Sequence, residues 1–171
     1  MNAKEGKERE QAVYNVLDEL NIKYSVKYHE PIFGEQDYDK ECYHMPGLNL
    51  KNILIREKKK EEFYLVILKD DERLDFKKYK PFTGWSSKVT FAGDEDLVKY
   101  LGVHAGSCSV FGLINDVEHK VTVVIDDYVT RSDSEELINF HPNINTATLT
   151  MKVKDLFTFL DWTTNKVIRL D

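Results

Sequence analysis

Residues 52–69 read NILIREKKKEEFYLVILK, and this stretch decides the fold. Two apolar runs, 52–57 and 63–69, flank a short and highly charged segment. Runs rich in β-branched and aromatic residues on either side of a polar break predict a β-hairpin with a charged tip. The second run is apolar at successive positions 66–68, which is typical of a strand that is covered on both faces. We therefore expect this strand to lie between two layers of the protein.

Helices are expected on both sides of this hairpin. Apolar residues recur at spacings of three and four over residues 5–20 and 153–162, which predicts an amphipathic helix near each end of the chain. Two shorter helices are predicted between them. One spans residues 75–80 and is closed by Pro81, and the other spans 95–101, with Asp94 as its N-cap and Gly102 just after its end.

Further strands follow from alternating apolar residues, while residues 29–50 and 105–116 are expected to be irregular. Strands outnumber helices in this pattern, which indicates an α+β or mixed α/β protein and argues against a doubly wound sheet. The additional strands are predicted at 22–28, 88–92, 120–126, 137–140, 146–151 and 166–170.

The length and composition indicate one globular domain spanning residues 1–171. The chain is 42% hydrophobic and 32% charged, with a formal net charge of −6. An acidic balance argues against coating long stretches of duplex nucleic acid, but it allows the protein to grip a short single-stranded end. No stretch approaches the ~18 apolar residues of a membrane span, and the N-terminal residues do not resemble a secretory signal. Two cysteines are too few for a disulfide framework, so we expect a cytoplasmic protein.

The common catalytic fingerprints, such as the P-loop and His-Glu-x-x-His, are absent from the sequence. A metal site built from Cys42, His44, His104 and Cys108 is conceivable, but no Cys-x-x-Cys pair supports it. A nucleophilic Cys108 with His104 or His141 as its base is a second alternative. We expect neither, and we expect no metal and no cofactor.

Three segments carry more information. The first, 47–52, delivers Lys51 at the start of a strand; the second, 106–116, is GSCSVFGLIND; the third, 140–148, is FHPNINTAT. Each segment alone is also compatible with an ordinary loop or turn. Taken in this order, they resemble the prolyl-tRNA editing domain family, the YbaK/ProX-like aminoacyl-tRNA deacylases, and in particular its freestanding alanyl-tRNA(Pro) deacylase branch. The resemblance covers essentially the whole chain. It implies a mixed α/β fold around a strongly curved, largely antiparallel sheet flanked by helices.

The resemblance also assigns roles to residues. It implies that Lys51 holds a phosphate or polarises the acyl ester, and that a glycine-rich loop positions the substrate and the attacking water. This sequence has Val110 where the family has proline, and Thr164-Asn165 where the family often has Gly-His. The catalytic set is therefore expected to be Lys51, Gly106, Ser107, Cys108 and Ser109. The substrate-binding set is Asn52 and Asn143, with Phe140, His141 and, in the loop after Pro31, Ile32 and Phe33 as pocket walls.

The expected activity is hydrolysis of a mischarged aminoacyl-tRNA, most specifically alanyl-tRNA(Pro). The chain has no room for a synthetase catalytic domain, so it would act in trans. A synthetase rejects a smaller amino acid poorly, because one methylene is worth only about 1–3 kcal/mol, and a second site that excludes by size supplies the rest. The expected partner is the acceptor end of tRNA, with prolyl-tRNA synthetase as a further candidate. A basic rim is expected from Lys51, Arg56, Lys58, Lys59 and Lys60. The alternative is a non-catalytic module of the same fold that binds a tRNA end, a nucleotide or a synthetase.

Overall fold

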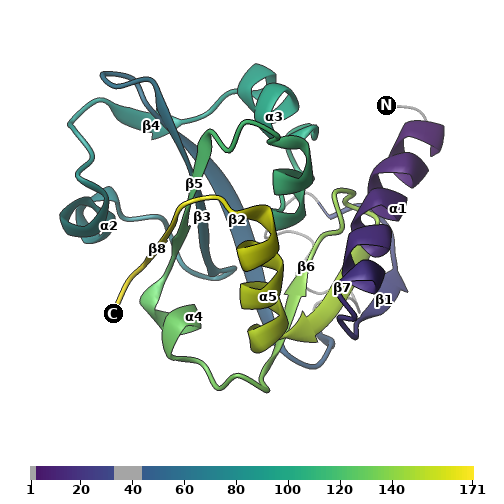
Figure 1. The fold of residues 1–171 in the computed structure, drawn as a ribbon. Coiled ribbons are helices and arrows are strands. Elements are labelled where there is room, and N and C mark those ends of the chain that lie inside the picture. The colour runs from purple at the N-terminus through teal and green to yellow at the C-terminus, as the bar shows by residue number, and fades with distance from the viewer. Residues whose placement is uncertain (1–2, 33–43) are drawn as a thin grey trace.

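The computed structural model describes residues 3–32 and 44–171 (Figure 1). Helices and strands alternate irregularly along the chain, as the sequence predicts for a mixed α/β protein. The elements are α1 (Ala3–Glu19), β1 (Ser25–Tyr28), β2 (Leu48–Glu57), β3 (Glu62–Lys69), α2 (Phe76–Thr83), β4 (Val89–Phe91), α3 (Asp94–Leu101), the 3₁₀ helix η3 (Val110–Asn115), β5 (Val121–Ile125), α4 (Asp127–Arg131), β6 (Leu137–Phe140), β7 (Ala147–Lys152), α5 (Val153–Thr163) and β8 (Val167–Arg169).

An eight-stranded sheet runs in the order β1-β7-β6-β2-β3-β5-β8, and β4 pairs with β2 beside this path. The predicted hairpin is confirmed, because β2 pairs antiparallel with β3 from Leu50 opposite Lys69 to Glu57 opposite Glu62. Within the described residues, β1–β7, β6–β7 and β2–β4 are also antiparallel, whereas β2–β6, β3–β5 and β5–β8 are parallel. The mixed α/β fold is confirmed, with a sheet more evenly mixed than the resemblance implied.

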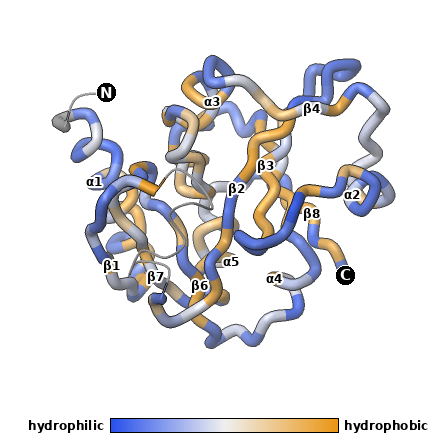
Figure 2. The backbone as a smooth tube through the Cα atoms, turned by 180° about the vertical axis from the view of Figure 1, so that it is seen from behind, coloured by the Kyte–Doolittle hydropathy of each residue, from blue (hydrophilic) through white to orange (hydrophobic). Residues whose placement is uncertain are grey.

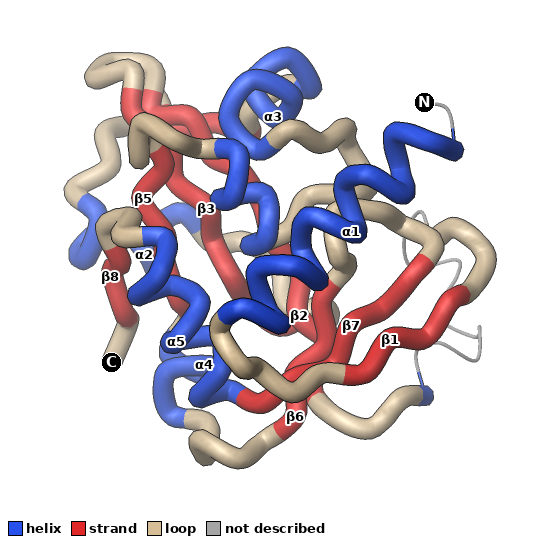
Figure 3. The backbone as a smooth tube through the Cα atoms, turned by 45° about the vertical axis from the view of Figure 1, so that its right-hand side comes forward, coloured by secondary structure: helices blue, strands red, loops and turns tan. Residues whose placement is uncertain are grey.

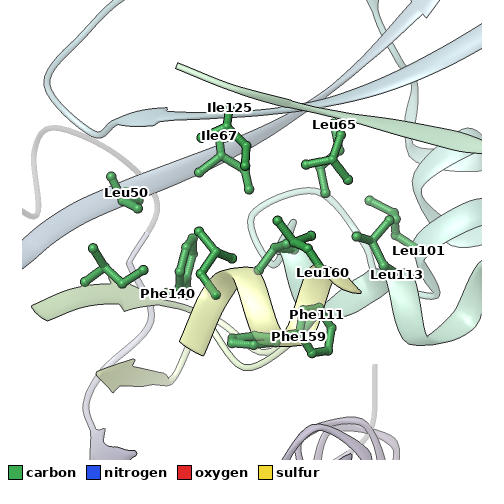
Figure 4. Close-up of a cluster of buried hydrophobic side chains, with 14 of the residues drawn as sticks. Leu50, Leu65, Ile67, Leu101, Phe111, Leu113, Ile125, Phe140, Phe159 and Leu160 are labelled. Carbon is green, nitrogen blue, oxygen red and sulfur yellow. The ribbon is translucent and has the colours of Figure 1, made fainter. Parts of the chain in front are cut away.

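Apolar side chains cover both faces of this sheet. The larger cluster joins the sheet to α1, α3, η3 and α5. At its centre Phe111 lies 5.7 Å from Phe140 and 5.2 Å from Phe159, measured between ring centroids (Figure 4). The smaller cluster sets Tyr79 of α2 and Trp85 against the opposite face of β2 and β3. Strand β3 contributes to both clusters, which confirms that it is covered on both sides.

The helices divide the sheet into regions. Helix α5 crosses in front of the middle of the sheet, and α1 lies over the part formed by β7 and β1 (Figures 1 and 3). Seen from behind, hydrophobic colour runs along β3 and along the part of β2 toward β4, while α2 is largely hydrophilic (Figure 2). Among the described residues, no helix has the length and apolar character needed to cross a membrane.

Helix α2 does not end at Pro81, contrary to the prediction. It continues to Thr83, and Gly84 follows in the left-handed conformation with φ 69°. A proline in a helix removes one backbone hydrogen bond. Here the Gly84 amide still donates to the Lys80 carbonyl at 2.9 Å and closes the last turn, so the short helix tolerates the proline.

Helix α3 also begins differently from the prediction, since its N-cap is Gly93 and not Asp94. The Asp94 carboxylate instead accepts hydrogen bonds from the Ala105 amide and from Nδ1 of His104, each at 2.8 Å. These bonds hold the pKa of Asp94 below its ordinary value. The predicted Gly102 position after the helix is confirmed, with φ 65°. Asp94 therefore ties α3 to the loop that leads into Gly106.

The segment 105–116, predicted to be irregular, contains the 3₁₀ helix η3. Ser109 is its N-cap, and the Ser109 hydroxyl accepts from the Phe111 amide at 3.2 Å. Val110 is the first helical residue and is fully buried. The first residue of a helix has no intrahelical partner for its amide, which is why proline is favoured there. The loop forms here with valine in that position.

Candidate functional site

A small pocket lies at the seam where β2 pairs in parallel with β6. The space in it that a water-sized sphere can occupy is about 40 Å³, which is room for a few water molecules or a small chemical group. Three of the predicted wall residues, Ile32, Phe140 and His141, line it. The fourth, Phe33, lies outside the described residues. The remaining lining comes from Asn49, Leu50, Asp70, Asn139 and Thr148.

Strand alternation explains the polar part of this lining. Ile138 and Leu149 belong to the larger apolar cluster, so their neighbours Asn139 and Thr148 point to the other face of the sheet. Asn139 is held rigidly, because its amide nitrogen donates to Oδ1 of Asn49 at 2.9 Å and to the Pro46 carbonyl at 3.2 Å. Its Oδ1 accepts from Thr150 at 2.6 Å.

Lys51 lies on β2 near this pocket without lining it. Its Nζ donates to the backbone carbonyl of Asp70 at 2.9 Å, and Asp70 lines the pocket. The ammonium group is therefore placed beside the pocket by the paired ends of β2 and β3. A lysine at a pocket rim can attract a phosphate or a developing oxyanion.

His141 follows β6 directly and has a fixed orientation. Its Nδ1 lies 3.0 Å from the Ala147 carbonyl, which can only accept, so Nδ1 carries the hydrogen and Nε2 is left as an acceptor. Burial lowers the pKa of His141 below its ordinary value, and the hydrogen bond to Ala147 opposes this shift. The ring is consequently neutral at pH 7.

The Gly106 loop stands next to the same turn that carries His141. Gly106 is exposed and adopts φ 90°, a conformation that favours glycine. A Cβ on it would lie 4.0 Å from Nδ2 of Asn145, and the Asn145 carbonyl accepts from the Ile32 amide at 3.4 Å. Ser107 and Ser109 are buried. Asn145 thus connects the loop to the pocket wall.

Cys108 packs against the larger apolar cluster, and burial raises the pKa of its thiol to about 12 despite a hydrogen bond from the Leu54 backbone. A thiol with such a pKa is protonated at pH 7, which argues against a thiolate nucleophile. The conceived metal set includes Cys42, which lies outside the described residues. Within residues 3–32 and 44–171, no three His, Cys, Asp or Glu side chains cluster as metal ligands would.

Asn52 and Asn143 were predicted to bind substrate, and each has a buried Oδ1 with no hydrogen-bond partner among the described residues. Asn52 lies on the same side of β2 as Leu54, a residue of the larger apolar cluster, rather than on the side of Lys51. Asn143 lines a separate surface groove between α1 and α3. The predicted residues therefore form two neighbouring groups, one around the pocket and one around the Gly106 loop.

The predicted basic rim does not form around Lys51. Lys58, Lys59 and Lys60 stand at the hairpin tip, roughly 20 Å along β2 from Lys51 at 3.3 Å per residue, so they do not share a rim with it. Arg56, near that tip, is paired with an acidic side chain at 2.7 Å.

Asn165, which stands where the family often has histidine, is buried. Its Nδ2 donates to the Asp116 carboxylate and to the Val121 carbonyl, both at 2.8 Å. Thr164 before it has φ 60°, which explains why a glycine would suit that position. These residues hold β5 and have no part in the pocket lining.

Comparison with known proteins decides the family. A sequence profile of the family described as "Aminoacyl-tRNA editing domain" matches residues 30–159. The chain belongs to the aminoacyl-tRNA editing domain family. It is 35% identical over 147 residues to the prolyl-tRNA editing protein ProX of Acetoanaerobium sticklandii, covering 85% of this chain and 87% of that protein. It is 26% identical over 156 residues to the prolyl-tRNA synthetase associated domain-containing protein 1 of Bos taurus, covering 91% and 90%.

Solved structures of editing-domain proteins and others share this fold. The crystal structure of a proposed trans-editing enzyme for prolyl-tRNA synthetase has a TM-score of 0.67 at 15% identity, covering 95% of this chain and 98% of that chain. A hypothetical protein has a TM-score of 0.69 at 14% identity, covering 91% and 95%. At these identities the likeness concerns the fold alone.

Sequence reasoning gave no role to five polar residues of the pocket region, namely His29, Asn49, Asp70, Asn139 and Thr148. Thr148 lines the pocket, and His29 contacts it at 2.8 Å. Strand alternation could have singled out Thr148, because it interrupts a run of core residues in β7. Nothing in the sequence alone indicates that the end of β1 lies beside β7.

Proposed function

We propose that this editing-domain protein is a trans-acting deacylase that hydrolyses mischarged aminoacyl-tRNA, with alanyl-tRNA(Pro) as its substrate. The observation that carries the proposal is the small pocket bordered by His141, Phe140 and Ile32 in a chain of the editing family. The names of its relatives, which refer to prolyl-tRNA editing and to prolyl-tRNA synthetase, support the choice of tRNA.

The chemistry needs no covalent nucleophile. An aminoacyl ester is already activated, so a positioned water and stabilisation of the developing oxyanion are sufficient. We assign Lys51 to the ester or the terminal phosphate, because its ammonium group is hydrogen-bonded to the carbonyl of Asp70, a residue that lines the pocket. The backbone of the loop formed by Gly106, Ser107, Cys108 and Ser109 is assigned to positioning the acceptor end and the water. The protonated thiol of Cys108 is compatible with this backbone role.

Substrate choice is assigned to size. The pocket would admit the methyl side chain of alanine and exclude the larger ring of proline, with the neutral His141 acting as a wall. Phe140 is held in the core by its contact with Phe111, so this wall has little freedom to move. The assignment of Asn52 and Asn143 to polar parts of the substrate rests on the family resemblance, since neither residue lines this pocket, although each has a buried oxygen with no hydrogen-bond partner among the described residues.

The alternative is a non-catalytic module that binds a tRNA end or a synthetase. Val110 in place of the family proline would favour this alternative if the loop failed to form, but η3 forms with valine at its first position.

The test is to offer purified protein a panel of alanyl-, prolyl-, cysteinyl- and seryl-tRNA and to measure loss of the ester. The proposal expects fast loss from alanyl-tRNA(Pro) and slow loss from prolyl-tRNA(Pro). Binding of the tRNAs without ester loss above the spontaneous rate would support the binding module instead.

A further inference from the structure

His29 stands directly after β1 and beside the pocket. Its backbone amide donates to the Thr146 carbonyl at 2.9 Å, which fixes the position of the residue against β7. Its ring nitrogen Nδ1 lies 2.7 Å from the Glu30 carbonyl, and Nε2 lies 2.8 Å from Oγ1 of Thr148. The ring centroid is 6.2 Å from that of His141. Two imidazoles therefore flank the same polar wall.

These contacts determine which atoms donate. The Glu30 carbonyl can only accept, so Nδ1 of His29 carries a hydrogen. In the neutral imidazole Nε2 then has no hydrogen and must accept, which makes the Thr148 hydroxyl the donor in the 2.8 Å contact. The Thr148 hydroxyl therefore donates its hydrogen to His29, and its oxygen can still accept a hydrogen bond from another group.

The consequence is a pocket wall that presents acceptors. Thr148 is 7% exposed and lines the pocket, and its hydroxyl hydrogen points to His29. His141 presents Nε2 as an acceptor, because its Nδ1 donates to a carbonyl. Both amide hydrogens of Asn139 are taken by oxygens of the protein. A ligand that donates hydrogen bonds complements such a wall better than one that only accepts.

We propose that Thr148 accepts a hydrogen bond from the α-amino group of the aminoacyl ester, and that His29 is the positioning residue that keeps Thr148 in this role. This inference rests on the proposed function. In an alanyl ester the α-amino group carries the N–H donors, while the ester oxygens only accept. Thr148 would thus read the amino group, while apolar lining such as Ile32 meets the methyl group.

The experiment compares alanyl-tRNA(Pro) with propionyl-tRNA(Pro), which keeps the carbon chain and lacks the amine. For each ester kcat and KM are measured, and the catalysed rate is divided by the spontaneous rate to correct for intrinsic reactivity. The wild type should prefer the alanyl ester. Thr148→Val removes the hydroxyl at nearly constant volume. It should lower kcat/KM for the alanyl ester about 10-fold, the effect expected from the loss of one hydrogen bond. The same variant should leave the propionyl ester unchanged.

Two further variants separate positioning from structure. His29→Phe removes the acceptor but not the Thr148 hydroxyl, and it should produce the same selective loss. Thr148→Ser and His29→Gln, which can rebuild the hydrogen bond, should recover most of the preference for the alanyl ester. Thermal melting of each variant checks that it is folded.

The outcomes distinguish the two levels of the argument. A wild type that hydrolyses neither ester overturns the proposed function and this inference with it. In the other case the wild type hydrolyses the alanyl ester, while Thr148→Val and Thr148→Ser lower kcat/KM equally for both esters or leave it unchanged for both. That result would overturn only the role of Thr148 and His29.

Discussion

At the scale of single residues, Lys51 carries the sharpest prediction. Among the residues that the structure describes, its Nζ makes one hydrogen bond, to the Asp70 carbonyl, and the residue is partly exposed. Lys51→Ala should therefore cost only about 0.5–1.5 kcal/mol of stability. If Lys51 stabilises the developing oxyanion, kcat should fall by about 10²–10³-fold. The measurement is single-turnover deacylation of alanyl-tRNA(Pro) beside thermal melting.

The exposed Lys23 provides a matched control, since Lys23→Ala removes one positive charge from a residue that does not line the pocket. Its activity should stay at the wild-type level. If Lys51→Ala also turns over like the wild type, Lys51 is not part of the catalytic machinery.

His141 tests whether the pocket selects by shape. His141→Ala should raise activity on prolyl-tRNA relative to alanyl-tRNA and lower activity on alanyl-tRNA only moderately. A general base would behave differently, because its loss costs about 10²–10⁴-fold for every substrate alike. The measured quantity is the alanyl-to-prolyl ratio of kcat/KM for variant and wild type. A large uniform loss with an unchanged ratio would argue for the base.

Protonation of His141 should make the stability of the protein depend on pH. Because burial lowers its pKa, the folded protein holds the ring neutral while the unfolded chain protonates it near the ordinary value of 6.5. The contribution of His141 to stability is full above that value and falls as the pH drops below it toward the folded pKa. Wild type should therefore lose more stability than His141→Ala between about pH 6.5 and pH 5, as denaturant midpoints would show. Equal losses in the two proteins would contradict the lowered pKa.

At the scale of elements, alanine substitutions at three glycines distinguish the effect of helix packing from the effect of loop conformation. A Cβ on Gly112 would lie 2.7 Å from Cβ of Leu101, so Gly112→Ala should force η3 away from α3 and cost about 1–3 kcal/mol. Gly106→Ala meets nothing closer than 4.0 Å but is strained at φ 90°, at about 1–2 kcal/mol. Gly93→Ala, with φ −81° and no atom within 4 Å, is the control.

The deacylation activities of these variants should not follow their stabilities. Gly106→Ala should lose deacylation even well below its melting temperature, because the loop backbone is its proposed working part. Gly93→Ala should retain activity and lose no more than about 1 kcal/mol of stability, since alanine is a weaker N-cap than glycine. Full activity in Gly106→Ala would remove this loop from the site.

The elements also show what a sequence can and cannot predict. The β2–β3 hairpin and the terminal helices follow from local periodicity and were predicted. The helix η3 and the five-residue α4 were not, because they are too short to show a period. Parallel pairings such as Leu48 opposite Ile138 join distant segments, and no local pattern encodes them. The same limit applies to the candidate site. His141 lies in a sequence motif and was therefore singled out, whereas His29 is brought to the pocket only by the β1–β7 pairing and was missed.

At the scale of the whole molecule, charge should limit contact with tRNA. The net charge is −6, and the lysines of the hairpin tip stand far from Lys51, so only a few phosphates are within reach of the pocket. With about 0.7 counterions released per contact on a single strand, the slope of log affinity against log salt should be about −2 to −3. Equilibrium binding of tRNA(Pro) over a salt series measures it. A slope steeper than about −6 would indicate a broad tRNA footprint instead.

The central claim is that a small pocket at the β2–β6 seam makes this editing-domain protein a selective deacylase. The most direct test is the initial rate of amino acid release from alanyl-tRNA(Pro) and prolyl-tRNA(Pro), each in large excess over the protein. The account predicts many turnovers on the alanyl ester and release from the prolyl ester near the spontaneous rate. Equal release from both esters, or less than one turnover per protein on the alanyl ester, would contradict it.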